Sequence, residues 1–523
     1  MKKTHLIIAG LLVVVLLSCS NSHKTSGSSL VTITVGSNQS ASVSIQQATL
    51  YAKLRNFLAD HLQVSSAMAS IPTNVASIQI MAQASDMDTI TKTLDTAGLS
   101  SVSITIEVPN GVSRHFVVIG FEGPGNTGNM AYWGDMSVDL NGSDVFLPVP
   151  MINLGSVTNI LYVSTGGNDA TGDGSEQNPF RTITNALAAS NNNEAIFVGP
   201  GTYDDVTGGE IFPLQLNPGT ALVGRGQNQT TVINGSSGIN GAPGAYIDSL
   251  RIFVCDSTGI DDLGSITHIN NVLLDSSLSC GGGAGDGIVL AADSTVSNTT
   301  IKDPFTSGIT INSGNPVIKN NTITVTAGAL VSPFNGIFVA AGNPTITNST
   351  INGFFADGAG WAISLGTGTA TVSQCSMSGN GNGISISGGS PTISGNTISN
   401  SSSYGIYVSL SGAGAPPTAT ISGNTIGHNG YGIYGDAVGT SLIHNNKIFC
   451  SSAVDFYLVD SAANNFDISG NAWDHDTTTL VSGPTITNNF NGCPSGEDIC
   501  YAYLLTTAPT YTPFNTAVPG GCQ

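Results

Sequence analysis

The feature that most constrains the fold is a tandem repeat between about residues 287 and 476. Each unit joins a short string such as GISI (383–386) to a second one such as PTISGNTI (391–398). A repeat of twenty-odd residues predicts a solenoid, in which each unit is one coil made of short β-strands with sharp corners. One apolar position marks the same point of each coil: Ile247, Ile269, Val296, Ile318, Ile346, Val372, Ile393, Ile421, Ile443 and Ile468.

Two columns of residues mark a corner of each coil. The first column holds residues that tolerate positive φ, and it consists of Asn320, Asn348, Gln374, Gly395, Gly423, Asn445 and Gly470. The second column is rich in asparagine and includes Asn396, Asn424, Asn446 and Asn471. Stacked amides can hydrogen-bond along the axis and satisfy the backbone of the corner. We therefore expect an inward ladder of asparagines.

The repeated GI-x-h and h-x-G/N-N-x-I strings, where h is apolar, resemble those of right-handed parallel β-helix proteins of the pectin-lyase-like superfamily. The resemblance covers roughly residues 161–491, with the repeats proper at 236–491. It implies an all-β fold built on a right-handed parallel β-helix. The superfamily includes polysaccharide lyases, glycoside hydrolases, epimerases, tailspikes and non-catalytic adhesins, so the resemblance alone does not select a chemistry.

Residues 161–235 contain the pieces YVS, NPF-x-TI-x-x-AL, V-x-PGTY and GE-x-FP. They resemble a domain family of unknown function that begins β-helices in bacterial secreted proteins. Within this segment Phe180, Ile183, Ala186 and Leu187 give a short helix with one apolar face. We expect that helix to cover the open end of the first coil, because an uncovered coil exposes unpaired strand edges.

The first 18 residues combine Lys2 and Lys3 with an apolar run, and Leu16-Leu17-Ser18-Cys19 follows. This order resembles a bacterial lipoprotein signal peptide, with lipidation at Cys19. It implies a mature chain that begins at Cys19 and a tether over 19–29. Ser20 instead of aspartate after Cys19 resembles lipoproteins of the outer membrane. We therefore expect a periplasmic or surface-exposed protein that touches the membrane only through its lipid anchor.

Residues 30–152 form the N-terminal region. A helix is expected over 44–63, and alternating strings such as SIQIMAQA (77–84) predict strands from 77 onwards. Their order resembles an immunoglobulin-like or transthyretin-like β-sandwich, a small module before the β-helix.

Composition restricts the partners. The chain has 13 Lys and Arg against 33 Asp and Glu, a net charge of −20, so nucleic acid is excluded as a partner on charge grounds.

Cys19 is one of eight cysteines; the other seven cannot all pair within one chain. Cys375 is expected to be buried and free. Cys255 and Cys280 are candidates for a bridge, and the tail at 492–523 contains further cysteines that could pair with Cys450.

Carboxylates next to a lysine could support β-elimination or hydrolysis of a polysaccharide. Aligned columns place Asp275 beside Lys302 on neighbouring coils, with Asp303 next in sequence, and Asp286 precedes a clear GI string. A surface ion pair is the alternative interpretation.

No cofactor is required by this sequence. Calcium is the one ion considered, at Asp169, Asp173 and Glu176, where a polar turn is the competing interpretation.

An outward column of the repeat ends in tyrosines on consecutive coils, Tyr407, Tyr434 and Tyr457, with Tyr404 and Tyr431 just before the glycines of two of these coils. Exposed aromatic rings are suited to sugar faces, whereas cross-strand packing is the other reading. Two functions therefore remain open. The sequence favours a non-catalytic surface protein that binds a polysaccharide or surface glycan or supports adhesion, and the alternative is a polysaccharide lyase or glycoside hydrolase.

Overall fold

The structure is a computed structural model. It describes residues 27–35, 71–149 without 97–98 and 100, 151–458 with gaps, 471–473, 486–488 and 497–501. The gaps are 226–229, 236–237, 255–257, 277–284, 305, 327–334, 356–359, 410–415 and 437–440.

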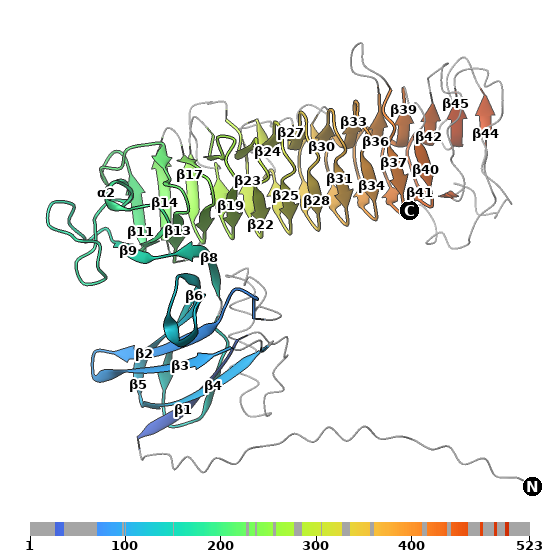
Figure 1. Ribbon diagram of the computed structural model, residues 1–523. Helices are drawn as coiled ribbons and strands as arrows, with labels where there is room; N and C mark the ends of the chain where they lie inside the picture. Colours follow the sequence, from blue (N-terminus) through green and yellow to red (C-terminus); the bar gives the residue numbers. More distant parts are fainter. Residues whose placement is uncertain are drawn as a thin grey trace, which may run out of the picture.

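Most of the chain is a solenoid of three long parallel sheets, each contributed one strand at a time by successive coils (Figure 1). The first sheet has 12 strands: β9 (Asn159–Val163), β10 (Glu194–Val198), β13 (Ala221–Gly224), β16 (Ala245–Asp248), β19 (Thr267–Asn270), β22 (Thr295–Ser297), β25 (Val317–Lys319), β28 (Thr345–Thr347), β31 (Thr371–Ser373), β34 (Thr392–Ser394), β37 (Thr420–Ser422) and β40 (Leu442–His444).

The second sheet also has 12 strands: β11 (Gly201–Asp204), β14 (Thr230–Gly235), β17 (Arg251–Val254), β20 (Leu273–Asp275), β23 (Thr300–Lys302), β26 (Thr322–Thr324), β29 (Thr350–Asn352), β32 (Ser376–Ser378), β35 (Thr397–Ser399), β38 (Thr425–Gly427), β41 (Lys447–Phe449) and β43 (Ala472–Trp473).

The third sheet has 13 strands: β12 (Leu214–Gln215), β15 (Ile239–Asn240), β18 (Ile260–Asp261), β21 (Ile288–Leu290), β24 (Ser307–Ile311), β27 (Asn335–Val339), β30 (Trp361–Leu365), β33 (Asn382–Ile386), β36 (Tyr404–Val408), β39 (Tyr431–Gly435), β42 (Val454–Leu458), β45 (Glu497–Tyr501) and β44 (Ile486–Asn488). The predicted parallel β-helix is therefore confirmed.

The interior of the solenoid is a continuous stack of the predicted apolar columns. Ile393 and Ile421 are register partners on adjacent coils, and both are fully buried. Since side chains alternate along a strand, the residues on either side of each such isoleucine face outward. The buried apolar side chains therefore form one continuous core, which extends from Leu161 to Phe456.

The predicted corner is confirmed at six of its seven positions, and the seventh, Gly470, lies outside the described residues. Positive φ occurs at Asn320, Asn348, Gln374, Gly395, Gly423 and Asn445. One residue later, the amide of Asn424 donates from Nδ2 to the Ile393 carbonyl at 2.9 Å and to Oδ1 of Asn446 at 2.9 Å. Asn396 and Asn446 repeat the pattern on the coils on either side of it. The ladder satisfies buried backbone groups that the corner leaves without strand partners.

The helix α2 (Ile183–Ala189) covers the first coil, as expected, and buries Ile183, Ala186 and Leu187. Two carboxylates hold its N-terminus. Asp169 accepts from Thr182 N at 3.0 Å, and the buried Glu210 accepts from Ile183 N at 2.7 Å and Thr184 N at 2.8 Å. Both carboxylates therefore complete backbone N–H groups that have no partner inside the helix.

The N-terminal module is a β-sandwich, as predicted. Its larger sheet consists of β3 (Met87–Asp95), β2 (Ser77–Ala84), β5 (Gly111–Phe121), β6 (Met130–Leu140) and β8 (Ile152–Val157). Its smaller sheet consists of β4 (Val102–Pro109), β1 (Ser28–Val35) and β7 (Val145–Leu147), and the short η1 (Pro124–Asn126) lies between β5 and β6. Apolar side chains of both sheets, such as Ile33, Ile104 and Val118, form one core.

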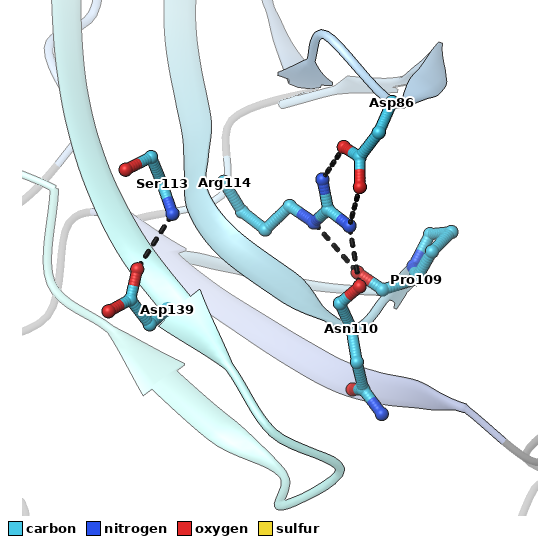
Figure 2. A network of polar contacts seen from close by, with 6 residues as sticks. All are labelled: Asp86, Pro109, Asn110, Ser113, Arg114 and Asp139. Atoms are coloured by element: carbon cyan, nitrogen blue, oxygen red, sulfur yellow. Dashed lines mark hydrogen bonds and ion pairs between the residues drawn. The ribbon is translucent and has the colours of Figure 1, made fainter.

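A buried arginine fastens one end of the sandwich. Arg114 is 1% exposed, and Figure 2 shows its guanidinium reaching across to Asp86, an acceptor on the turn between β2 and β3. It also donates from Nε to the Pro109 carbonyl at 2.9 Å and from Nη2 to the Asn110 carbonyl at 2.5 Å. The hydrogen bond from Arg114 lowers the pKa of Asp86. All these partners are structural, so Arg114 holds the β4–β5 turn against its neighbour.

The module packs on the outer face of the first sheet at its N-terminal coils (Figure 1). Trp133 of β6 meets Phe197 of β10 edge to face, with ring centroids 4.5 Å apart. Asp135 of β6 pairs with Arg225, which follows β13, and with His115 at 2.8 Å. The contact therefore combines an apolar centre with a charged cluster.

Several predictions fall outside the described residues: the helix at 44–63, the anchor at Cys19, the Cys255–Cys280 bridge and most of the tail at 492–523. Cys375 is buried and free, as expected, and its burial raises its pKa to about 11. Cys450 is disulfide-bonded. Of the described residues, none belongs to a helix with the length and apolarity of a membrane span.

Candidate functional site

Six aromatic side chains gather on the outer face of the third sheet. They come from four strands, β30, β36, β39 and β42, and we call them the aromatic patch: Trp361, Tyr404, Tyr407, Tyr431, Tyr434 and Tyr457. All six are half-buried, whereas their neighbours Ile406 and Ile433 are fully buried in the core. The patch is therefore an outward feature of strands whose other side chains form the interior.

The register of the third sheet explains how two outward columns lie side by side. Tyr404 pairs with Tyr431, and Tyr407 pairs with Tyr434. Between the columns lies an inward position with almost no space, since a Cβ on Gly405 would come within 2.5 Å of the Gly432 carbonyl oxygen. Glycine at this position allows the backbones of adjacent coils to approach closely. The residue before the glycine, Tyr404, and the second residue after it, Tyr407, both face outward.

The rings pack against one another instead of forming a flat platform. The ring centroids of Tyr407 and Tyr434 are 5.5 Å apart with 44° between the planes, and those of Tyr434 and Tyr457 are 4.9 Å apart with 30°. Parallel strands repeat about every 4.8 Å, which is too close for coplanar rings, so the rings tilt over one another. The rings therefore overlap along the solenoid axis and do not form one flat surface.

Trp361 belongs to the patch although the sequence interpretation did not include it. Its ring stacks on Tyr404 and Tyr407 at centroid distances of 6.4 and 5.9 Å. It reaches across β33, where the residues in the same two columns are the small and buried Asn382 and Ser385. The sequence could have predicted this, because Trp361 occupies the same repeat position as Tyr404. The match is hard to see because Ala362 stands where the other coils have glycine.

Four phenols of the patch have a raised pKa and therefore stay protonated at neutral pH. Burial raises the pKa of Tyr404, Tyr434 and Tyr457. The pKa of Tyr407 is also raised, first by burial and then by Asp436, whose Oδ2 accepts its hydrogen bond at 3.0 Å. Each of these four phenols can therefore donate as well as accept a hydrogen bond.

The four candidate catalytic residues lie in different surroundings. Asp275 and Lys302 are register partners on the second sheet, as the columns predicted, but Asp275 already accepts from Arg251 Nη2 at 2.7 Å. Asp303 is buried at a corner and accepts from Thr326 N and, at 2.9 Å, from Thr326 Oγ1. These contacts give Asp275 and Asp303 structural partners.

Asp286 lies apart from that group, just before β21 of the third sheet. The N–H of the following Gly287 donates to the Ser307 carbonyl at 2.9 Å, which places Asp286 next to the start of β24. Burial raises its pKa, and its buried Oδ1 has no hydrogen-bond partner among the described residues. Asp286 lies two residues before β21, a strand of the sheet that carries the aromatic patch.

The residues considered for calcium are engaged in local hydrogen bonds. Asp169 accepts from Arg181 N, Thr182 N and Thr182 Oγ1, and Asp173 accepts from Ser175 N at 2.9 Å. Glu176 lies in the same loop. Within the described parts of the chain, no three His, Cys, Asp or Glu residues form a group that could hold a metal ion. Calcium binding in this loop remains a prediction.

Solved structures share the general architecture. A GH136 lacto-N-biosidase from Eubacterium ramulus is 11% identical with a TM-score of 0.42, covering 60% of this chain and 68% of its own. A PL6 family alginate lyase is 13% identical with a TM-score of 0.42, covering 59% and 53%. The catalytic domain of a GH87 alpha-1,3-glucanase is 11% identical with a TM-score of 0.26, covering 86% and 89%. Similarities this low carry no information about chemistry.

No curated protein matches the chain in sequence. One family does, over residues 165–480, which include both the segment that begins the β-helix and nearly all of its coils. That span is more than half of the chain, and the protein therefore belongs to the DUF1565 family, described as proteins of unknown function.

Proposed function

We propose that the protein is a non-catalytic glycan-binding β-helix protein, tethered to the bacterial outer membrane by a lipid on Cys19. The observation that carries the binding role is the aromatic patch, six outward and half-buried rings on one face of one sheet. Soluble proteins seldom leave contiguous aromatic surface exposed without a partner. Sugar rings offer apolar C–H faces and many hydroxyl groups, and both fit this surface.

Packing alone is the competing explanation for the patch, because cross-strand aromatic pairs stabilise a sheet. Two features favour binding. Five of the six rings carry a hydroxyl group, and Asp436, which accepts from the Tyr407 hydroxyl, is exposed. A patch that served only packing would need neither the phenol oxygens nor an exposed carboxylate at its edge.

The test is a Tyr407→Ala/Tyr434→Ala double variant, assayed against a panel of soluble plant, bacterial and algal polysaccharides. A matched control is Thr397→Ala/Thr425→Ala, which changes two outward residues of the second sheet. Thr397 lies on β35, the strand before β36, and Thr425 lies on β38, the strand before β39. We expect the tyrosine variant to lose about tenfold or more of its affinity, with the control unchanged. Equal affinity in both variants would assign the patch to packing.

The alternative function is a polysaccharide lyase or glycoside hydrolase. Its supporting observation is Asp286, a carboxyl group with a raised pKa and a buried oxygen that has no described partner. Incubation of the protein with the same polysaccharides, followed by assay of new chain ends, tests this function. Chain cleavage that disappears in Asp286→Asn, with the fold retained, would favour the enzyme over the binding protein.

A further inference from the structure

The charge on the third sheet differs from that on the other two sheets. None of its 13 strands contains Lys, Arg or His. In the described strands of the solenoid, these three residue types lie elsewhere: Arg251, Lys302 and Lys447 on the second sheet, and Lys319, His268 and His444 on the first. The aromatic patch therefore has no cationic side chain on its own sheet.

Carboxylates occur on this face instead. Asp436 is exposed at the end of β39 and bonded to Tyr407, and the outward Asp261 lies towards the N-terminal end of the same sheet. A polysaccharide that carries carboxylates would meet like charges here and find no arginine or lysine to pair with. The net charge of −20 on the whole chain adds a repulsive field.

From this charge pattern we infer that the aromatic patch selects neutral glycan chains and rejects uronate-rich ones. The inference rests on the proposed function and specifies its ligand. Neutral sugar rings need only apolar contact and hydrogen bonds, and the patch provides both. Asp436 and the phenol oxygens accept from sugar hydroxyl groups, and the phenol hydrogens donate to sugar oxygens. The patch spans the strands β30, β33, β36, β39 and β42, so an extended chain fits along the solenoid axis.

The experiment compares neutral probes (galactomannan, xyloglucan and a β-1,3-glucan) with anionic probes (alginate and polygalacturonate) by calorimetry, at low and high salt. We expect affinity for at least one neutral probe, little changed by salt. Binding of both anionic probes should be at least about tenfold weaker at low salt, and the gap should narrow as salt screens the repulsion.

A charge variant separates selectivity from binding itself. Ser364→Lys places a cation in the outward column of the patch, two strands before Tyr407, and Thr397→Lys places the same charge on the second sheet. We expect Ser364→Lys to gain affinity for alginate or polygalacturonate, and Thr397→Lys to gain none.

The outcomes distinguish two failures. Anionic probes that bind the parent protein as tightly as neutral ones, in a manner that Tyr407→Ala/Tyr434→Ala abolishes, would overturn the selectivity and keep the proposed function. Absence of binding to every probe, or binding that the tyrosine variant retains, would overturn the proposed function and this inference with it.

Discussion

The phenol hydroxyl of Tyr407 donates a hydrogen bond to Oδ2 of Asp436, with 3.0 Å between the two oxygens. The two residues lie on successive coils, Tyr407 within β36 and Asp436 directly after β39. The bond thus joins the aromatic patch to the nearest exposed carboxylate and fixes the direction of one phenol. Since the acceptor carries a negative charge, it disfavours ionisation of the phenol.

The first prediction follows from this bond. Replacement of Asp436 by Asn keeps an acceptor but removes the charge, so the pKa of Tyr407 should fall towards the ordinary tyrosine value. Alkaline titration of tyrosinate absorbance in the parent and in Asp436→Asn measures the shift. The same pair in a Tyr407→Phe background serves as the control, and a shift that persisted there would belong to another tyrosine.

The second prediction concerns the asparagine ladder. Asn424 is 1% exposed, donates to the Ile393 carbonyl and accepts from Asn396 N and Nδ2. Asn424→Ala leaves those buried groups without partners, which should lower the free energy of unfolding by about 1–3 kcal/mol. Urea denaturation measures the change. Thr425→Ala, the outward neighbour, should stay within about 0.5 kcal/mol of the parent, and an equal loss in both variants would contradict the ladder.

The third prediction concerns a buried carboxyl group in the first sheet. Asp248 is 4% exposed, and burial raises its pKa to about 6 against the opposing hydrogen bonds from Ser249 and Asn270. In the unfolded chain its pKa is about 3.9. Asp248 therefore stays protonated to a higher pH in the folded state than in the unfolded chain. The protonated carboxyl group favours the folded state fully below about pH 4, and this stabilisation is lost as the pH rises through about 6.

Asp248→Asn should remove this pH dependence, because the amide is neutral at every pH and can still accept from Asn270 Nδ2, which lies 2.7 Å from Oδ2. Relative to the parent, the variant should gain up to roughly 3 kcal/mol between pH 4 and pH 7. Urea unfolding at both pH values measures the gain. Asp88→Asn, at an exposed position of β3, is the control; a variant whose advantage does not change with pH would refute the assignment.

The fourth prediction concerns the membrane anchor. The basic start, the apolar run and Leu16-Leu17-Ser18-Cys19 lead us to expect lipidation at Cys19. Cys19→Ser should release the protein from the membrane fraction into the soluble fraction of the cell envelope. Fractionation with immunoblotting measures this, and Ser20→Ala should stay membrane-bound. Retention of Cys19→Ser in membranes would count against the anchor.

The sequence by itself determined the solenoid and the direction of most side chains within it. Ile393 and Ile421 recur at one point of each coil, and an inward isoleucine forces its neighbours outward because strand side chains alternate. The positive φ at Asn445 and Gly423 and the ladder position of Asn424 were predicted for the same local reason. The tyrosine columns were readable too, since residues at one repeat position lie on one face.

Only the tertiary structure decided how residues of different coils and elements meet. The sequence did not reveal that Trp361 reaches across β33 to Tyr404 and Tyr407, because this depends on how small Asn382 and Ser385 are. It also did not indicate that Arg251 forms an ion pair with Asp275, or that Trp133 of the N-terminal module packs against Phe197 of the solenoid. A repeat fixes each side chain's direction by local backbone geometry, whereas contacts between coils and modules depend on side-chain size and on packing between distant segments.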